Sequence, residues 1–553
     1  FSKNFLKLLQ ENLSEVSLMT KFLKSFLSQK ILQLAILFSI QGVYIILNLL
    51  FPFLNGKFLD VLINADTLNN ILDFIYVLSF IGIMDIFFSY TYKLLSLKIK
   101  SDISFLVNLS LIEHINKIFI EKFESFNPTY LNERIKEDSD AVVSFWIENS
   151  CYFIFNILSF IFITFILAKV NIIVMYSVFV FSFIYFIIYN IIKHPMFKVN
   201  KEMLEQSNSF FNNLNEIFLR NREIRTRSEY DKSSKFLNFE YNSLINKVLK
   251  FGKISFAFSS IDEFISLIFS IFIFIVGGTY VINKKLTIGE FTVISVYFSM
   301  ILNIIKYFFN IGQEYQMAKG SLERLMEIKN LEKETNGVKS LKKISKIQLK
   351  NFNYKFNENI LYKNDLNITF EKGNIYCLTG KNGCGKSTLI NSIIGINKIN
   401  KSGKILIENI EIDNLDMYEL RKKNISYMPQ KEFFRMLTVE EFIKDTVNVD
   451  ILKINSDKLF ERLFFSEVLN LNDIVKKNVT NLSGGEKQLV SLVVTILKNS
   501  DIYVFDEPTS NLNNNLIEPF INYINYLANL QKTVIVISHD PKIINSIKNN
   551  IKL

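Results

Sequence analysis

The feature that most limits how this chain can fold is a series of long apolar runs before about residue 330. Two of them, ILQLAILFSIQGVYIILNLLF from Ile31 and YFIFNILSFIFITFILA from Tyr152, approach or exceed the roughly 20 residues that a helix needs to cross a bilayer core. Hydrophobic residues make up 49% of the chain, which is too apolar for an ordinary soluble protein of 553 residues. No such run follows, so the pattern predicts a membrane domain and then a soluble domain.

Six candidate spans can be placed in this first part. The linkers after the first, third and fifth spans are short and nearly neutral, whereas residues 193–253 hold twelve Lys or Arg against seven acids. Because basic loops stay on the cytoplasmic side of a cell membrane, both termini and the soluble domain are predicted to be cytoplasmic. The predicted spans are residues 31–54, 70–97, 143–169, 171–192, 255–278 and 286–311.

Residues 1–30 alternate lysine with apolar residues at helical spacing and contain acids but no small-residue cleavage site. This pattern predicts an amphipathic helix lying on the membrane rather than a cleaved signal peptide. The predicted domains are this N-terminal helix, a six-helix transmembrane domain with cytoplasmic extensions over 31–325, a charged linker over 326–344 and a soluble domain over 345–553.

The net charge of +10 does not indicate nucleic acid as a partner, because Lys and Arg concentrate in the loops between spans rather than in one basic module. The three cysteines, Cys151, Cys377 and Cys384, are too few and of odd number to form a disulfide framework. The soluble domain is therefore expected in a reducing compartment.

From about Ile347 the sequence changes to short β-rich runs between helical or polar segments, which predicts an α/β domain. Where these runs are continuously apolar, parallel central strands are expected. The runs are IQLKNFNY, LNITF, NIYCLTG, KILIENIEI, NISYMPQ, DIYVFDE and TVIVISH.

A phosphate-binding loop follows the run NIYCLTG. The segment GKNGCGKST fits the pattern G-x-x-x-x-G-K-[ST] and opens a helix, so its backbone N–H groups can surround the phosphates of ATP. Lys386 would reach the β and γ oxygens, and Ser387 would ligate Mg²⁺. The predicted nucleotide-binding residues are Gly380, Lys381, Asn382, Gly383, Cys384, Gly385, Lys386, Ser387 and Thr388.

Two adjacent acids end the run DIYVFDE, whose strand is expected to lie beside the strand that precedes the phosphate loop. Asp506 is predicted to hold Mg²⁺ through water, and Glu507 to accept a proton from the attacking water. Gln430 and His539 each follow a β run, where a polar side chain can face the γ-phosphate. Both are catalytic candidates, and Gln430 is also a candidate metal and nucleotide contact.

A second anion-binding pattern occurs in TNLSGGEKQLV, where Ser483, Gly484, Gly485 and Glu486 open a helix. The chain already has one phosphate loop. The simplest interpretation is that this turn serves a nucleotide held by another subunit.

Together these motifs resemble the ATP-binding cassette (ABC) transporters. GKNGCGKST resembles the Walker A motif of that family, ISYMPQ its Q-loop, LSGGE its signature, YVFDEPTS its Walker B motif and VISHD its switch-histidine region. Their order and spacing match over roughly 345–553. The resemblance implies an α/β P-loop domain with a helical subdomain, in which Phe356 stacks on adenine and Tyr354 is a competing choice.

The first 330 residues resemble the membrane domain of the exporter-type members. The segments PFLNGKFLDVLI, KKLTIGEF and AKGSLERLMEI fall in the expected order. Residues 126–132 and 217–222 fall where such transporters place coupling helices, and the second would dock on the partner subunit's nucleotide domain. The implied assembly is a dimer with a second half-transporter, favoured as a homodimer, holding two composite ATP sites.

Three positions depart from the family pattern. Leu489 and Val494 stand where the family usually has Arg, so packing is expected to replace salt links around that helix. Asn513 ends the D-loop in place of Asp, and Glu486 ends the signature in place of the commoner Gln. No departure removes a group expected to touch phosphate or metal, so ATP hydrolysis is still expected.

The function that follows is ATP-driven export across the membrane by alternating access. An ATP-gated or regulatory subunit with little turnover, or a lipid flippase, are the alternatives. The substrate stays open among peptide, lipid and drug-like molecules. Polar residues inside or near spans that could line its path, or sit at a membrane edge, are Asp85, Asp262, Glu263 and Lys306.

Overall fold

The chain forms two compact units in a computed structural model. One unit holds the chain up to Ile112 together with Pro128–Lys329, and the other holds Glu113–Asn127 together with Asn330–Leu553. The structure describes residues 19–64, 68–124, 126, 128–170, 172–356, 359–381, 383–397, 401–430, 432, 434–448, 474–510 and 516–553.

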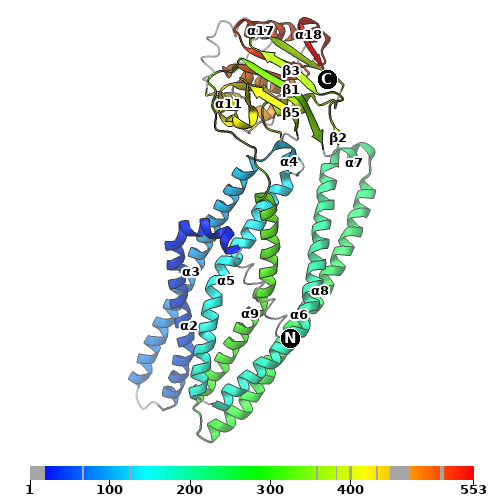
Figure 1. Ribbon diagram of the computed structural model, residues 1–553. Coiled ribbons are helices and arrows are strands. Elements are labelled where there is room, and N and C mark those ends of the chain that lie inside the picture. Colours follow the sequence, from blue (N-terminus) through cyan, green and yellow to red (C-terminus); the bar gives the residue numbers. More distant parts are fainter. Residues whose placement is uncertain are drawn as a thin grey trace. The chain divides into compact units, whose positions relative to one another are not determined.

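The first unit is a bundle of long helices (Figure 1). Within it α5 packs along α9, α6 along α8, and α2 along α9. A short helix, α7 (Asn221–Arg227), joins α6 to α8. The long helices are α2 (Ile31–Asn64), α3 (Leu68–Ile115), α5 (Pro128–Val170), α6 (Ile172–Leu219), α8 (Tyr230–Ile282) and α9 (Ile288–Lys329).

Five helices among the described residues are long and apolar enough to cross a membrane, and α6 adds a shorter apolar stretch, Met175–Ile188. Many large apolar side chains point outward from these helices, as expected where the surrounding solvent is lipid. The helical membrane domain expected from the sequence is thus confirmed. Each of the six predicted runs overlaps one of the long helices, and each of these helices extends beyond its run.

Residues 19–27, at the start of the described chain, are helical and have one buried face. Met19, Phe22, Leu23 and Leu27 are buried at spacings of three and four residues, while Lys21 and Lys24 on the other face are exposed. This part of the predicted N-terminal helix is therefore amphipathic. Residues 1–18 of that prediction lie outside the described residues.

Two glycines bring α2 and α9 into contact at one end of the bundle. A Cβ added to Gly289 would lie 2.0 Å from the carbonyl oxygen of Gly56, so no larger residue fits there without a shift. Asp60 accepts hydrogen bonds from the Gly289 N–H at 2.8 Å and from the Thr287 hydroxyl at 2.7 Å. The segments PFLNGKFLDVLI and KKLTIGEF, far apart in the sequence, are thus joined.

The second unit contains two sheets. A parallel sheet has the strand order β10-β4-β9-β8-β7, and an antiparallel sheet has the order β2-β1-β5-β6 with β3 beside β1. The strands are β1 (Lys346–Phe356), β2 (Asn359–Ile360), β3 (Leu366–Glu371), β4 (Ile375–Thr379), β5 (Lys401–Ile407), β6 (Ile410–Glu411), β7 (Ile425–Met428), β8 (Ile502–Asp506), β9 (Thr533–Ile537) and β10 (Asn549–Lys552).

The predicted β runs all become strands, and KILIENIEI becomes two. Glu408 and Asn409 have φ angles of 50° and 63°, the left-handed conformation of a tight hairpin turn, so β5 folds back on β6. The apolar runs of β8 and β9 are buried at every position and pair in parallel, as predicted.

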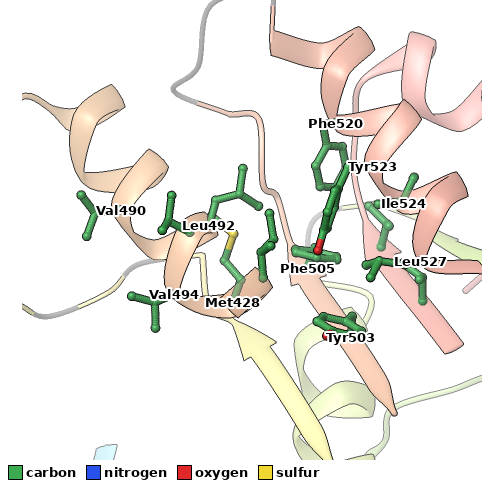
Figure 2. Close-up of a cluster of buried hydrophobic side chains, with 14 of the residues drawn as sticks. Met428, Val490, Leu492, Val494, Tyr503, Phe505, Phe520, Tyr523, Ile524 and Leu527 are labelled. Atoms are coloured by element: carbon green, nitrogen blue, oxygen red, sulfur yellow. The ribbon is translucent and has the colours of Figure 1, made fainter. Parts of the chain in front are cut away.

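One face of the parallel sheet packs against α16 and α17, and the other packs against α10 and the antiparallel sheet. Figure 2 shows Phe505 of β8 between Phe520 of α17 and the side chains of α16, within one apolar cluster. The helices of this unit outside Glu113–Asn127 are α10 (Lys386–Ile393), α11 (Met417–Lys423), α12 (Val439–Val447), α16 (Gly484–Leu497), α17 (Ile517–Asn529) and α18 (Pro541–Ser546).

The helix that follows the LSGGE segment is held by packing at the two positions that depart from the family pattern. Leu489 is 1% exposed and Val494 is 8% exposed, and Val494 belongs to the apolar cluster of Figure 2. The expectation that packing replaces salt links there is confirmed for these side chains. Residues 449–473 lie outside the described residues.

The segment Glu113–Asn127 belongs to the second unit although it follows α3 of the first. Its short helix α4 (Ile120–Glu124) begins with a hydrogen bond from the Ile120 N–H to the carbonyl oxygen of Ile396, at 3.2 Å. The Tyr354 hydroxyl donates to Glu121. The short helix thus lies a few residues before the predicted segment 126–132, and α7 likewise lies a few residues beyond the start of 217–222.

Candidate functional site

The predicted site residues follow neighbouring strands of the parallel sheet. The P-loop follows β4, His539 follows β9, Asp506 ends β8 and Gln430 follows β7. The expectation that the strand DIYVFDE lies beside the loop strand is wrong, because β9 pairs with both and separates β8 from β4. All four strands are parallel, so their carboxyl ends still meet at one edge. Ligands of open α/β sheets bind at this edge.

The P-loop curls around its own lysine. Lys386 is 9% exposed, and its Nζ donates to the carbonyl oxygen of Gly380 at 2.8 Å and to that of Lys381 at 3.4 Å. Gly385 has φ 96°, and a Cβ there would lie 2.6 Å from Leu361, so the loop needs glycine at this position. The lysine ammonium is thus placed beneath the loop at the start of α10.

Asp506 lies at the buried end of β8, beside the first turn of α10. Its Oδ2 accepts a hydrogen bond from the Ser387 hydroxyl at 3.2 Å, and Tyr427 also donates to it. Asp506 is 4% exposed, and this burial raises the pKa of its carboxyl in spite of the hydrogen bond from Ser387. Burial, followed by the neighbouring Asp506, likewise raises the pKa of Tyr427.

Glu507 leaves the strand in a strained backbone conformation. Its φ is 51°, and its N–H donates to the carbonyl oxygen of Ile537 at 2.9 Å. Its side chain turns toward Gln430, whose Nε2 donates to Glu507 Oε2 at 3.0 Å. From the helix side, Gln488 Nε2 donates to the Glu507 carbonyl oxygen at 2.8 Å.

His539 lies between the lysine and the glutamate. Its Nε2 is 3.1 Å from Lys386 Nζ and 3.9 Å from Glu507 Oε1. The structure therefore brings together six residues that the sequence analysis selected from four separate motifs: Lys386, Ser387, Gln430, Asp506, Glu507 and His539.

The LSGGE turn forms the start of α16. The Ser483 hydroxyl accepts from the Glu486 N–H at 3.3 Å, and Glu486 Oε2 accepts from the Ser483 N–H at 2.7 Å. This reciprocal capping lowers the pKa of Glu486, chiefly through the Ser483 backbone N–H. Gly484 has no atom near its missing Cβ, so that face of the turn is open.

Not all of the predicted site residues are among those that the structure describes. Asn382 and Asn513 lie outside the described residues, as does the side chain of Phe356. Tyr354, the competing choice for adenine stacking, is 2% exposed, and its hydroxyl is bound to Glu121. Because its ring is in the core, Tyr354 is not available to stack on a base.

Gly380, Lys381, Gly383 and Cys384 lie between β4 and α10, and Thr388 lies in the first turn of α10. Gly383 has φ 82° and no atom within 4 Å of a built Cβ, so this part of the loop faces open space. The Cys384 N–H donates to the Lys381 carbonyl oxygen at 3.2 Å, which closes a turn. Exposed backbone N–H groups in such a loop can bind phosphate oxygens.

Three supporting residues were not found from the sequence. Tyr362 donates to the Gly385 carbonyl oxygen at 2.8 Å, Tyr427 to Asp506, and Gln488 to Glu507. Tyr427 and Gln488 lie inside motifs that were recognised for other positions. The side chain of Tyr427 reaches the site because β7 pairs with β8, and that of Gln488 reaches it because α16 packs nearby. A short stretch of sequence does not predict such tertiary contacts.

The fold and the site define a class: a P-loop nucleotide-binding domain joined to a helical membrane domain. The sequence profile of the ABC transporter transmembrane region matches residues 16–305, and that of the ABC transporter ATP-binding domain matches residues 363–510. The chain belongs to the ABC transporter family. It is a multi-pass membrane protein with an ATP-binding ABC ATPase domain.

Individual relatives agree with this family. A putative ABC transporter ATP-binding protein of Clostridium tetani is 35% identical over 200 residues, which cover 36% of this chain and 44% of the relative. The lactococcin-G-processing and transport ATP-binding protein LagD of Lactococcus lactis is 26% identical over 317 residues, or 54% of this chain and 43% of the relative. The chain thus spans less than half the length of either curated relative.

A solved structure shares the fold over nearly the whole chain. A bacterial Atm1-family ABC exporter with ATP bound superimposes with a TM-score of 0.76 at 13% sequence identity, covering 95% of this chain and 93% of the other. At this identity the likeness concerns the fold alone.

Proposed function

We propose that the protein is one half of a dimeric exporter in which ATP binding and hydrolysis drive alternating access across the cell membrane. The observation that supports this most is the convergence of Lys386, Asp506, Glu507, Gln430 and His539 at one sheet edge. A member whose site only gates or regulates would not need a glutamate, a glutamine and a histidine positioned together.

In this proposal Glu507 is the general base. Its carboxylate is held by Gln430 and lies near His539, at a strand end where it can meet a water opposite the γ-phosphate. Gln430 and His539 would contact the γ-phosphate and report its presence to the rest of the domain. The positive φ of Glu507 is a strained conformation of the kind that clusters at such sites.

The residues beside Asp506 fit a magnesium ion. Ser387 Oγ and Asp506 Oδ2, 3.2 Å apart, are hard oxygen ligands of the type that Mg²⁺ prefers, and Gln430 offers an amide oxygen. The described residues contain no group of three or more acidic, histidine or cysteine ligands, which suits an ion bound mainly by phosphate and water. When bound, Mg²⁺ supplies positive charge to the phosphate oxygens.

The LSGGE turn would complete the site of a second copy. Ser483, Gly484, Gly485 and Glu486 open α16. The side chains of Ser483 and Glu486 form the capping box, and Glu486 also pairs with Lys477 at 3.6 Å. ATP held between the P-loop of one subunit and this turn of the other favours the closed dimer, and hydrolysis removes that preference. A homodimer is the proposed assembly, with both termini cytoplasmic.

A peptide is the proposed substrate. Support comes from relatives whose names describe lactococcin processing and transport. A transport assay in liposomes tests this against the alternatives, in which a lipid or a drug-like molecule is transported instead.

The Glu507→Gln variant tests the proposed mechanism. We expect ATP turnover of the purified, lipid-reconstituted protein to fall by roughly 10²-fold or more, because a positioned base contributes about that factor, while ATP affinity is retained. Glu518→Gln, an exposed acid in the first turn of α17, is the matched control and keeps full turnover. Unchanged phosphate release by Glu507→Gln would show that Glu507 is not the base.

A further inference from the structure

A pocket of about 330 Å³ lies within the first unit, between α2, α5 and α9. Its lining residues recur three or four positions apart on each helix, so three helix faces converge on it. Eight of the thirteen lining residues are polar but uncharged. Four of these carry side-chain amides: Gln41, Asn48, Asn156 and Asn303.

Gln41 is a lining residue with a buried, unpaired side-chain amide. It is 0% exposed, and neither its Oε1 nor its Nε2 has a hydrogen-bond partner within the described part of the chain. It lies ten residues into α2, about 15 Å along a helix that crosses the membrane. An unpaired amide is costly to bury, and most of all where lipid surrounds the protein. A ligand that both donates and accepts a hydrogen bond would remove this cost.

The other polar groups of the pocket are partly engaged with the protein. The Asn48 amide donates to the Tyr44 hydroxyl at 3.4 Å, and the Tyr307 hydroxyl donates to the Asn149 carbonyl oxygen at 3.2 Å. Tyr152 packs on Tyr307 with 6.3 Å between ring centroids, which gives the pocket an aromatic wall. The pocket thus offers both flat apolar surface and neutral hydrogen-bonding groups.

Charge selects among the possible ligands. No Asp, Glu, Lys, Arg or His is among the residues described as lining the pocket, so an ionised group entering it would lose hydration without gaining a counter-charge. This disfavours a phosphate headgroup, an acidic peptide and a basic peptide. An uncharged amide-bearing segment loses least and can pair with Gln41 on both its donor and its acceptor.

We propose that this pocket binds the backbone of an uncharged peptide segment of the cargo, with Gln41 paired to one peptide group. The proposal deepens the proposed export function and rests on it. Asp85, Asp262, Glu263 and Lys306, the charged residues that the sequence suggested for a substrate path, are not among the lining residues. The cargo is therefore expected to contact neutral side chains in this pocket rather than those four charged ones.

The chain carries its own reporter for this site. Trp146, the one tryptophan in the sequence, lies on α5 six residues before Tyr152, about 9 Å along the helix axis. Its fluorescence can be followed in the reconstituted dimer without nucleotide. The probes are an acetylated and amidated pentapeptide of leucine, asparagine and glycine, the same peptide with two lysines or two aspartates, and tetramethylammonium.

We expect saturable binding of the neutral peptide and at least tenfold weaker binding of the charged probes. Gln41→Leu should weaken the neutral peptide by roughly tenfold, because the ligand's peptide group loses both its hydrogen bonds. Gln33→Leu is the matched control: it lies on the same helix, also has an unpaired buried side-chain oxygen, and does not line the pocket. The melting temperature of Gln41→Leu should not fall, since an unpaired buried amide is removed.

Equal or tighter binding of a charged probe, an undiminished response in Gln41→Leu, or no saturable binding of any probe would overturn the assignment. The Glu507→Gln variant separates this result from the proposed function. It should lose turnover yet keep the peptide response of Trp146. Normal turnover in Glu507→Gln together with intact peptide binding would refute the catalytic proposal and leave the pocket standing.

Discussion

The side-chain amide of Gln430 donates to the carboxylate of Glu507 across 3.0 Å, which joins the chain two residues beyond β7 to the residue after β8. The Glu507 main chain is also anchored, through its N–H to Ile537 and through its carbonyl oxygen to Gln488. The position of the candidate base is therefore defined by two neighbouring strands and one helix, with Gln430 fixing the carboxylate itself.

Replacing Gln430 by Met should lower ATP turnover about tenfold and leave ATP affinity nearly unchanged. Met keeps the length of the side chain but removes the donor, and losing a hydrogen bond to a charged group costs about that factor. Phosphate release and nucleotide binding measure the two quantities. Gln348→Met, on β1 of the antiparallel sheet, is the control. Equal turnover in both variants would contradict this role for Gln430.

Asp506→Asn should separate function from stability. Burial raises the pKa of Asp506 above its ordinary value of 3.8, so the folded state holds this proton more tightly than the unfolded chain does. The charged carboxylate is thus a cost to folding at neutral pH, and the cost vanishes as pH falls through the folded and then the unfolded pKa.

We therefore expect Asp506→Asn to melt at a higher temperature than the parent protein at pH 7.5 without nucleotide, with the difference shrinking toward pH 4. The same variant should need a higher Mg²⁺ concentration for half-maximal ATP turnover, because one oxygen ligand of the ion loses its charge. Thermal unfolding across this pH range, with phosphate release at several Mg²⁺ concentrations, checks both. A lower melting temperature at pH 7.5 would show that hydrogen bonds from Ser387 and Tyr427 outweigh burial.

Two capping boxes in the second unit allow a matched comparison. Ser483 with Glu486 begins α16, and Thr438 with Glu441 begins α12. Ser483→Ala and Thr438→Ala should each cost about 1 kcal/mol of unfolding free energy, because each removes an N-cap. Only Ser483→Ala should also weaken ATP-dependent dimer closure, measured by cross-linking. If both variants lost dimer closure equally, Ser483 would act only as a helix cap and not as a contact to the partner's ATP.

Because Gly56 and Gly289 are in close contact, adding a single methyl group at Gly289 should lower the stability of the membrane unit. Gly289→Ala should destabilise the membrane unit by about 1–3 kcal/mol, because its Cβ would lie 2.0 Å from a backbone oxygen and force α2 from α9. Gly278→Ala in α8, where a Cβ meets no atom within 4 Å, should be neutral or slightly stabilising. Thermal inactivation in detergent measures both. Similar half-lives would contradict the close approach.

Sequence reasoning reached the sheet edge because its signals are local there. Lys386, Asp506 and His539 each end or follow a β run or a glycine-rich loop, and parallel pairing then brings them together. Tyr427 and Gln488 were missed because their side chains reach the site through tertiary packing. The short strands β2 and β10 were missed as well, since a strand of two to four residues is too short to show a periodic pattern.

The pocket between α2, α5 and α9 was not predicted from the sequence, for a different reason. Charged residues within apolar runs stand out, and they drew attention to Asp85, Asp262, Glu263 and Lys306. Amide and tyrosine side chains are common in such runs, so Gln41 and Asn156 gain meaning only when three helix faces meet.

The inclusion of Glu113–Asn127 in the second unit bears on how such chains can be divided. The Lys117 carbonyl oxygen accepts from the Glu334 N–H at 2.7 Å, and Glu121 accepts from Tyr354. A fragment starting near residue 330 would carry every nucleotide motif yet leave the buried hydroxyl of Tyr354 without its acceptor. A chimera that exchanges ATPase units between transporters should therefore transplant two pieces of chain, the short one included.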